Sequence, residues 1–398
     1  MKKLVLIFGV FVLIVMPVFG QFSIGGIVET HGLLAQGDLS SMEGVDDITT
    51  RGGWGFEFNV TLANLAETAG ATAALVDGTR IWAYGWWRPN RTLFLKSGDI
   101  FRNSTWAEGD ITCWGFHANY LHMTRPLEGF AGNVLRSGHG FFLPTMVMGR
   151  DPAMQITLTP INALTLNIGF PLQIGSPFLT DRRRNTFTET YWGHLHAQLV
   201  YEFAGIGEVA FSFVNAPACN YAENAAKRLF VHWKMPLGED MRIELGVNYD
   251  LPGQNLPGTA HPNRPLNIGL GWGMGNLEND DQMVINARFG AAIPMIDTDS
   301  TRLGLEVLFS YDLGIFRLYV PAGLGLLLPA NGDPLVAWSF APYIARSLFG
   351  PYLFIGFNIF NGDRSRPEIG DREIVSPGNV SNLNWSIPIG MRWEFSRR

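Results

Sequence analysis

The sequence is poor in cysteine, in charged residues and in long apolar runs. It holds 2 cysteines among 398 residues, and charged residues make up 16%. Beyond residue 20 no continuous apolar stretch reaches the roughly 20 residues that a membrane-spanning helix needs. Cys113 and Cys219 are too few for a metal framework, and their spacing leaves open whether they pair. The formal net charge of −6 argues against a nucleic-acid partner.

Recognisable catalytic patterns are also missing. The chain has no G-x-S-x-G nucleophile elbow and no glycine-rich phosphate loop. His194 and His196 share one face of an alternating segment, but no third metal ligand stands nearby, so we interpret them as ordinary wall or rim residues. We therefore expect no enzyme, metal or cofactor. A barrel protease with acidic pairs and a histidine is the alternative that the sequence leaves open.

The first 20 residues have the layout of a secretory signal peptide. Lys2 and Lys3 precede an apolar run of about 13 residues, which Pro17 ends. Small or tolerated residues then lead to Gly20, so we expect cleavage between Gly20 and Gln21. The alternative is an uncleaved anchor, for which the apolar run is short. The sequence thus predicts a signal peptide over 1–20 and one exported domain over 21–398.

Apolar and polar residues alternate in many segments of this domain. Between Leu266 and Trp272, for example, every second residue is large and apolar, and the residues between are asparagine or glycine. Such alternation is typical of a strand with one lipid-facing and one water-facing side. Aromatic residues at 13%, including 12 tryptophans, suit the girdles of a membrane barrel. The alternating segments are 54–62, 164–170, 191–203, 241–249, 266–273, 282–289, 302–309 and 383–395.

The last alternating segment carries a recognisable motif. Gly390, Trp393 and Phe395 in "GMRWEF" resemble the signal that the outer-membrane assembly machinery reads in barrel proteins. Two features depart from that pattern: Ile389 stands where a polar residue is usual, and three residues follow Phe395. The motif implies the assembly machinery and outer-membrane lipid as partners.

Connections between the alternating segments are long and short in turn. Short ones centre on residues 161–162, 205–206, 237–238, 277–278, 312–313 and 349–350. Barrels of the outer membrane have short periplasmic turns and longer external loops. We therefore predict an all-β, antiparallel, up-and-down transmembrane barrel of about 16 strands, within a range of 14 to 18.

Residues 101–150 are too long for a simple connection. A loop of this length is usually functional or disordered. We predict that it folds into the barrel and narrows it; an external cap or an extra hairpin is the alternative. Its candidate constriction residues are Trp106, Trp114, His117, Tyr120 and His122.

Acidic and basic residues are balanced at the positions predicted to face the lumen. A balanced wall predicts weak ion selectivity, whereas charged rings of one sign would make it strong. The same charges would also serve as cross-strand ion pairs that hold the wall together. The candidate lumen-facing charges are Glu57, Glu202, Glu208, Arg228, Lys234, Arg242, Glu244, Arg288, Arg302, Glu306, Arg392 and Glu394.

Together these features resemble the porin-like outer-membrane β-barrels, and the tryptophan-rich hairpins look similar to porin-like barrels of spirochaetes. The resemblance implies a passive channel for small hydrophilic solutes, and it allows a homotrimer, for which the sequence shows no interface. One alternative is a surface barrel without an open pore that acts as an adhesin or a structural protein. Another is a soluble exported β-protein.

Overall fold

The computed structural model describes residues 21–38, 53–76, 80–98, 153–171, 196–216, 226–251, 266–275, 281–293, 301–347, 351–361 and 383–397. No helix in these ranges is long and apolar enough to cross a membrane. All regular elements here are strands. They are β1 (Gln21–Asp38), β2 (Gly53–Ala63), β3 (Ala69–Val76), β4 (Arg80–Trp87), β5 (Leu93–Gly98), β6 (Ala153–Ile161), β7 (Leu164–Pro171), β8 (His196–Phe203), β9 (Gly207–Ala216), β10 (Ala226–Leu237), β11 (Met241–Leu251), β12 (Leu266–Met274), β13 (Met283–Ile293), β14 (Thr301–Asp312), β15 (Arg317–Leu328), β16 (Leu335–Phe340), β17 (Tyr343–Ser347), β18 (Tyr352–Gly356), β19 (Asn358–Asn361) and β20 (Leu383–Arg397).

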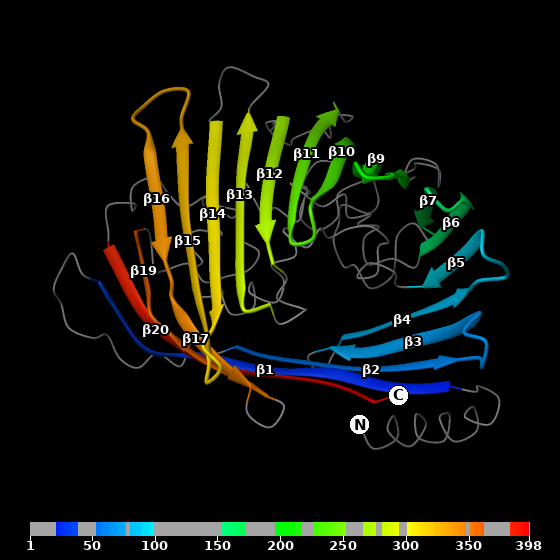
Figure 1. Cartoon of the computed structure of the whole chain (residues 1–398), viewed down its shortest axis with the longest axis horizontal. Coiled ribbons are helices and arrows are strands. Elements are labelled where there is room, and N and C mark those ends of the chain that lie inside the picture. The colour runs from blue at the N-terminus through cyan, green and yellow to red at the C-terminus, as the bar shows by residue number, and fades with distance from the viewer. Residues whose placement is uncertain are drawn as a thin grey trace, which may run out of the picture.

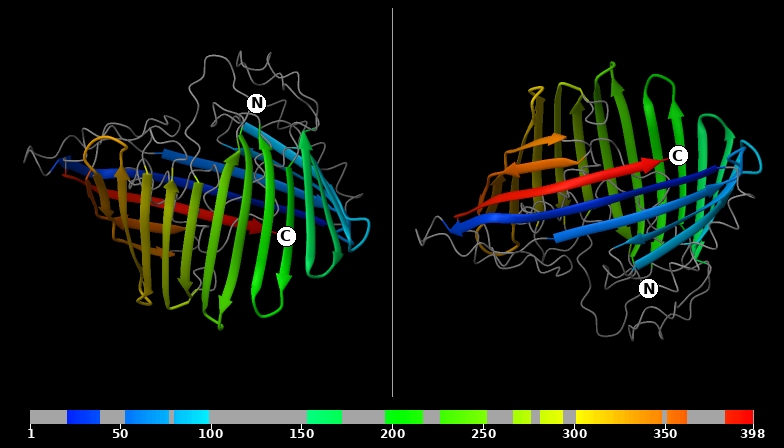
Figure 2. Two further views of the ribbon diagram at one scale, coloured as in Figure 1. Left: turned by 90° about the horizontal axis from the view of Figure 1, so that it is seen from above. Right: turned by 90° about the horizontal axis from the view of Figure 1, so that it is seen from below.

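These strands form one antiparallel sheet that returns to its first strand. From β1 to β15 each strand pairs with the next along the chain, as in a meander of hairpins (Figure 1). β20 then pairs with β1 from Ile24 opposite Arg397 to Asp38 opposite Asn384. In both views of Figure 2 the blue β1 and the red β20 run side by side. The first and last strands therefore complete the ring, and neither is left as a free edge.

Two of the strands are interrupted. Ala341 and Pro342 separate β16 from β17, and Phe357 separates β18 from β19. Proline has no N–H for the ladder, which explains the first break. The Ala341 N–H donates to the Pro321 carbonyl and the Phe357 N–H to the Pro342 carbonyl, so the halves stay in the sheet. If each interrupted strand is counted once, the 20 described elements make 18 barrel strands.

This number of barrel strands lies at the upper end of the predicted range of 14 to 18, above the preferred value of 16. β3 illustrates why the sequence count fell short. Ala71 and Ala73 stand on one of its faces, and Thr72 and Ala74 on the other. With small residues on both faces, the alternation that marks the other strands is weak.

Long and short connections alternate around the described part of the ring, as predicted. Two residues join β6 to β7, three join β8 to β9 and three join β10 to β11. The longest connection, between β5 and β6, spans residues 99–152. The alternation has two exceptions. Only residues 77–79 connect β3 to β4 on the long side, and the connection before β13 (275–282) is longer than the one after it (294–300).

The exposed face of the sheet carries apolar side chains and the buried face carries polar ones, which is the reverse of the arrangement in a soluble protein. On β8, Leu199 is 39% exposed, whereas its neighbour Gln198 is 1% exposed. The outer surface of a ring is the more accessible one, so the exposed face is the outer face. Its large apolar side chains include Phe211, Leu229, Leu245, Leu270, Phe289, Leu305 and Leu324. An apolar exterior with polar groups inside is the pattern of a membrane barrel.

Part of the inner face is apolar. Leu308, Tyr319, Tyr343 and Phe354 form a buried cluster on β14, β15, β17 and β18. The rings of Tyr319 and Tyr343 are stacked with centroids 4.6 Å apart. This cluster lies beside the interruption at Pro342, where side-chain packing supplements the shortened backbone ladder.

Candidate pore lining

A belt of polar side chains crosses the inner face from β5 to β9. Strand register places Lys96 opposite Gln155, Thr157 opposite Asn167, and Gln198 opposite both Asn167 and Ser212. Register partners share one face of a sheet, so the belt continues from strand to strand. On β8 this face is opposite to the exposed Leu199.

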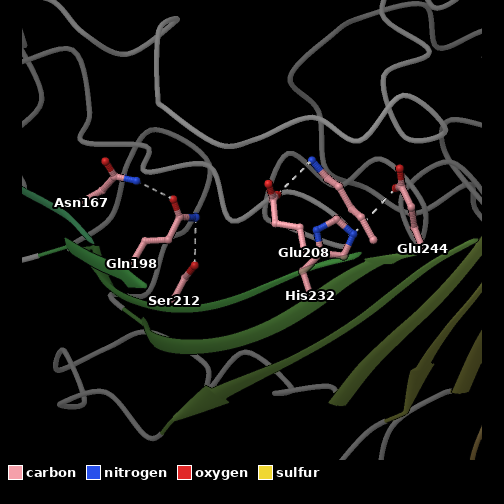
Figure 3. Close-up of polar contacts among 7 residues, drawn as sticks. Asn167, Gln198, Glu208, Ser212, His232 and Glu244 are labelled. Atoms are coloured by element: carbon pink, nitrogen blue, oxygen red, sulfur yellow. Dashed lines mark hydrogen bonds and ion pairs between the residues drawn. The ribbon is translucent and has the colours of Figure 1, made fainter. Parts of the chain in front are cut away.

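The belt is joined by direct hydrogen bonds. The Thr157 hydroxyl donates to Asn167 Oδ1 at 2.6 Å, Asn167 Nδ2 donates to Gln198 Oε1 at 3.1 Å, and Gln198 Nε2 donates to Ser212 Oγ at 3.1 Å. Figure 3 shows Asn167, Gln198 and Ser212 rising from one face of the strands. Each amide acts as donor on one side and acceptor on the other. Buried polar groups satisfied in this way give the wall a fixed geometry.

A charge cluster follows the belt on β9, β10 and β11. Lys234 stands in register with Glu208 on one side and Glu244 on the other. Lys234 Nζ lies 3.9 Å from Glu208 Oε1, with both side chains about one third exposed at 27% and 33%. His232 Nε2 lies 3.7 Å from Glu244 Oε2, with both side chains 2% exposed. The cluster therefore has an accessible half and a buried half. Figure 3 shows His232 beside Glu244.

Local sequence explains how the imidazole fits. The register partners of His232 are Ala210 on β9 and Gly246 on β11. Neither carries a large side chain, so the ring has room to reach Glu244, two residues from Gly246 along β11. Replacing either small neighbour would crowd a buried polar pair.

The opposite end of the belt combines cations with aromatic rings. Lys96 Nζ lies 5.2 Å from the ring centroid of Tyr84 and 5.9 Å from that of Phe94. Arg88 lies over the same Phe94 ring at 4.9 Å. The ring of Trp86 is 6.3 Å from that of Phe94. These distances allow cation–π attraction, which holds Lys96 against the rings on the inner face and the exposed Arg88 against Phe94 at the end of β4.

Five of the predicted lumen-facing charges have described side chains. Glu208, Lys234 and Glu244 belong to the cluster. Arg242 donates from Nη1 to the Gly275 carbonyl at 3.1 Å, beside the connection after β12. Glu202 is exposed near the end of β8. The strands bring the first three together and place Glu202 in register with Glu208, whereas Arg242 lies toward a short connection.

The other predicted charges are described only by their backbone positions. Arg288 on β13 and Glu306 on β14 are register partners, as an ion pair would require. The backbones of Glu57, Arg228, Arg302, Arg392 and Glu394 lie on β2, β10, β14 and β20. The constriction residues Trp106, Trp114, His117, Tyr120 and His122 lie outside the described residues, as do Cys113, His194 and Cys219. Their roles stay predictions.

The assembly-motif residues lie on β20, in the seam with β1. Gly390, Trp393 and Phe395 stand opposite His31, Val28 and Gly26. The rings of Trp393 and Phe395 are 5.1 Å apart, and Trp393 is 43% exposed. Their role in assembly is a prediction from the motif.

Sequence reasoning missed Lys96 and His232, and it gave Asn167 and Gln198 no role. Asn167 and Gln198 stand at the polar positions of the alternating segments 164–170 and 191–203, whereas Lys96 and His232 lie on β5 and β10, outside the segments named from the sequence. A rule that collects all polar residues on that face, rather than charged ones alone, would have found Asn167 and Gln198. The described residues include no cluster of three or more metal-binding side chains.

Solved structures of known proteins share the fold of this chain. The chain is similar to OpdK of Pseudomonas aeruginosa, with a TM-score of 0.53, 8% identity and coverage of 95% of this chain and 100% of that one. It is similar to OccK11 (OpdR) of the same organism, with a TM-score of 0.51, 12% identity and coverage of 96% and 97%. OccAB4 of Acinetobacter baumannii gives a TM-score of 0.52, 9% identity and coverage of 95% and 99%.

The chain shares the barrel fold of the outer membrane protein OpdK. The coverage of whole chains in both directions means that the barrel is matched along its length. At 8% to 12% identity the likeness concerns the fold alone. No protein-family model matches the chain, and no curated protein matches it.

Proposed function

We propose that this porin barrel is a channel of the outer membrane, through which small hydrophilic solutes diffuse passively. The observation that carries the proposal is the inner polar belt and charge cluster within a ring whose outer face is apolar. A wall that offers hydrogen bonds and charges of both signs suits the passage of hydrated solutes. The proposal involves no catalytic residue, cofactor or metal. The three solved structures described above share its fold.

We also propose that the chain is exported and that it folds as a single barrel domain. Residues 1–20 would be removed as a signal peptide, and residues 21–398 would form one barrel domain. Gly390, Trp393 and Phe395 would be read by the assembly machinery. Residues 101–150 would supply the constriction. Homotrimer formation is compatible with the proposal and is not needed for it.

We propose weak ion selectivity, because the accessible half of the charge cluster pairs one ammonium with one carboxylate. In a potassium chloride gradient the reversal potential across a bilayer should therefore lie near zero. Lys234→Gln removes a positive charge beside Glu208 and Glu244, so the reversal potential should shift toward cation selectivity.

The matched control is Arg91→Gln. Arg91 is exposed in the connection between β4 and β5, so this substitution removes the same positive charge at a site away from the cluster. Its reversal potential should equal that of the unmodified protein. Strong anion or cation selectivity in the unmodified barrel would contradict the proposal of weak selectivity. Equal shifts of the reversal potential in both variants would show that the charge cluster does not lie on the path of the ions.

A further inference from the structure

Four of the short connections that the structure describes each carry an aliphatic side chain that is more than half exposed. Turns are normally built from glycine, proline, asparagine, aspartate and serine, so large apolar residues there need an explanation. The exposed leucines of the strands reach at most 46%. We call the four residues the apolar tips: Leu65 is 78% exposed, Ile161 56%, Ile206 53% and Ile315 65%.

The apolar tips are distributed around one end of the ring. They belong to the connections β2 to β3, β6 to β7, β8 to β9 and β14 to β15, which alternate with the long connections at the other end. A protein partner that docks on one sector would leave the tips of the other sectors uncovered. A lipid layer surrounds the whole ring, so the distribution favours lipid as the partner.

The tip at Ile206 is continuous with the lipid-facing wall. Trp233 stands on the same face of β10 as the exposed Val231, and its indole N–H donates to the Ile206 carbonyl at 3.2 Å. The rings of Tyr201 and Phe203, at the end of β8, are 4.6 Å apart. Three aromatic side chains thus lie next to this tip.

Aromatic side chains also lie beside two other tips. Phe309 and Tyr311 stack with ring centroids 6.5 Å apart, just before the connection that carries Ile315. Trp87 is 53% exposed and stands in register with Ala69, which begins β3 directly after the connection of Leu65. Tryptophan and tyrosine rings of membrane barrels gather where the membrane meets water.

The tips lie only a short distance beyond these rings. The Ile206 N–H donates to the Phe203 carbonyl at 3.0 Å, so this connection is a tight turn that begins at an aromatic residue. A strand rises by about 3.3 Å per residue. The interfacial layer on each side of the hydrocarbon is roughly 5 to 8 Å thick. A tight turn that starts at the aromatic rings therefore ends within that layer.

We propose that the apolar tips are embedded in the interfacial layer of the membrane and anchor this end of the barrel there. Their partner is the lipid surface, and burial of the aliphatic side chains among the lipid molecules opposes movement of the ring along the membrane normal. The connection between β10 and β11 serves as the internal contrast. It consists of the exposed residues Gly238, Glu239 and Asp240, and it extends into water.

The test compares a fluorescent label at the apolar tips with the same label at Glu239. Cys113 and Cys219 are replaced by serine, and the purified barrel is refolded into vesicles of neutral lipid. Each variant is labelled with an environment-sensitive fluorophore and exposed either to nitroxide-bearing lipids or to iodide on both sides of the bilayer. The single substitutions are Leu65→Cys, Ile161→Cys, Ile206→Cys, Ile315→Cys and Glu239→Cys.

Labels at the four apolar tips should emit at shorter wavelength than the label at Glu239. The nitroxide lipids should quench them more strongly, and iodide should quench them less. The four positions are independent, so the comparison uses the variants that become heat-modifiable. Tip labels with the wavelength and iodide quenching of the Glu239 label would overturn the proposal, and because the vesicles hold no other protein, they would point to a protein partner instead.

Discussion

Leu270→Arg is expected to prevent stable assembly of the barrel in lipid. Leu270 lies in the middle of β12 and is 45% exposed on the outer face. An arginine on the lipid-facing surface at the midplane of the bilayer costs about 2 to 4 kcal/mol in barrel proteins. Urea titration of the protein refolded into lipid vesicles, followed by heat-modifiability on gels, would measure the loss.

The control for Leu270→Arg is the same substitution at an exposed leucine nearer the membrane interface. Leu313 is 50% exposed and lies in the short connection between β14 and β15. The cost of arginine falls to about 0 to 1 kcal/mol near the interface. Leu313→Arg should therefore assemble almost normally. Equal tolerance of arginine at both positions would mean that the outer face of β12 does not meet hydrocarbon.

Glu244→Leu is expected to lower the free energy of unfolding by about 3 kcal/mol, because it breaks a buried polar pair and leaves the His232 imidazole without this carboxylate. The reduction should be visible as a lower urea midpoint for the refolded barrel. Glu208→Gln is the matched control. Its carboxylate is 33% exposed, and a partly exposed pair contributes about 1 kcal/mol or less.

A double-mutant cycle separates the pair from other effects of the substitution. His232→Leu and Glu244→Leu together should cost less than the sum of the two single changes, because each single change already removes the contact between them. Strictly additive losses would show that the 3.7 Å contact does not stabilise the barrel.

The sequence predicted the fold largely through alternation and connection lengths. Leu266 to Trp272 alternates cleanly, and this segment is β12. The alternation can be recognised in the sequence because lipid requires apolar side chains and the lumen requires polar ones, and successive residues of a strand face the two in turn. Ala69–Val76 lacks that contrast, since small residues suit both environments. Where alternation was weak, the count of strands was less certain than the class of fold.

The polar wall was less predictable than the fold. Glu208, Lys234 and Glu244 could be named singly, but their contact depends on how β9, β10 and β11 align, and hairpin register is fixed by turns that a single sequence specifies weakly. The pairing of His232 with Glu244 also needs the small neighbours Ala210 and Gly246.

Conductance in a planar lipid bilayer tests the central claim most directly. The protein would be refolded, shown to be heat-modifiable and added to one side of the bilayer. An aqueous path through the ring predicts stepwise increases in current that persist under applied voltage. A barrel that inserts but carries no current would contradict the channel function and would favour a surface adhesin or a structural barrel.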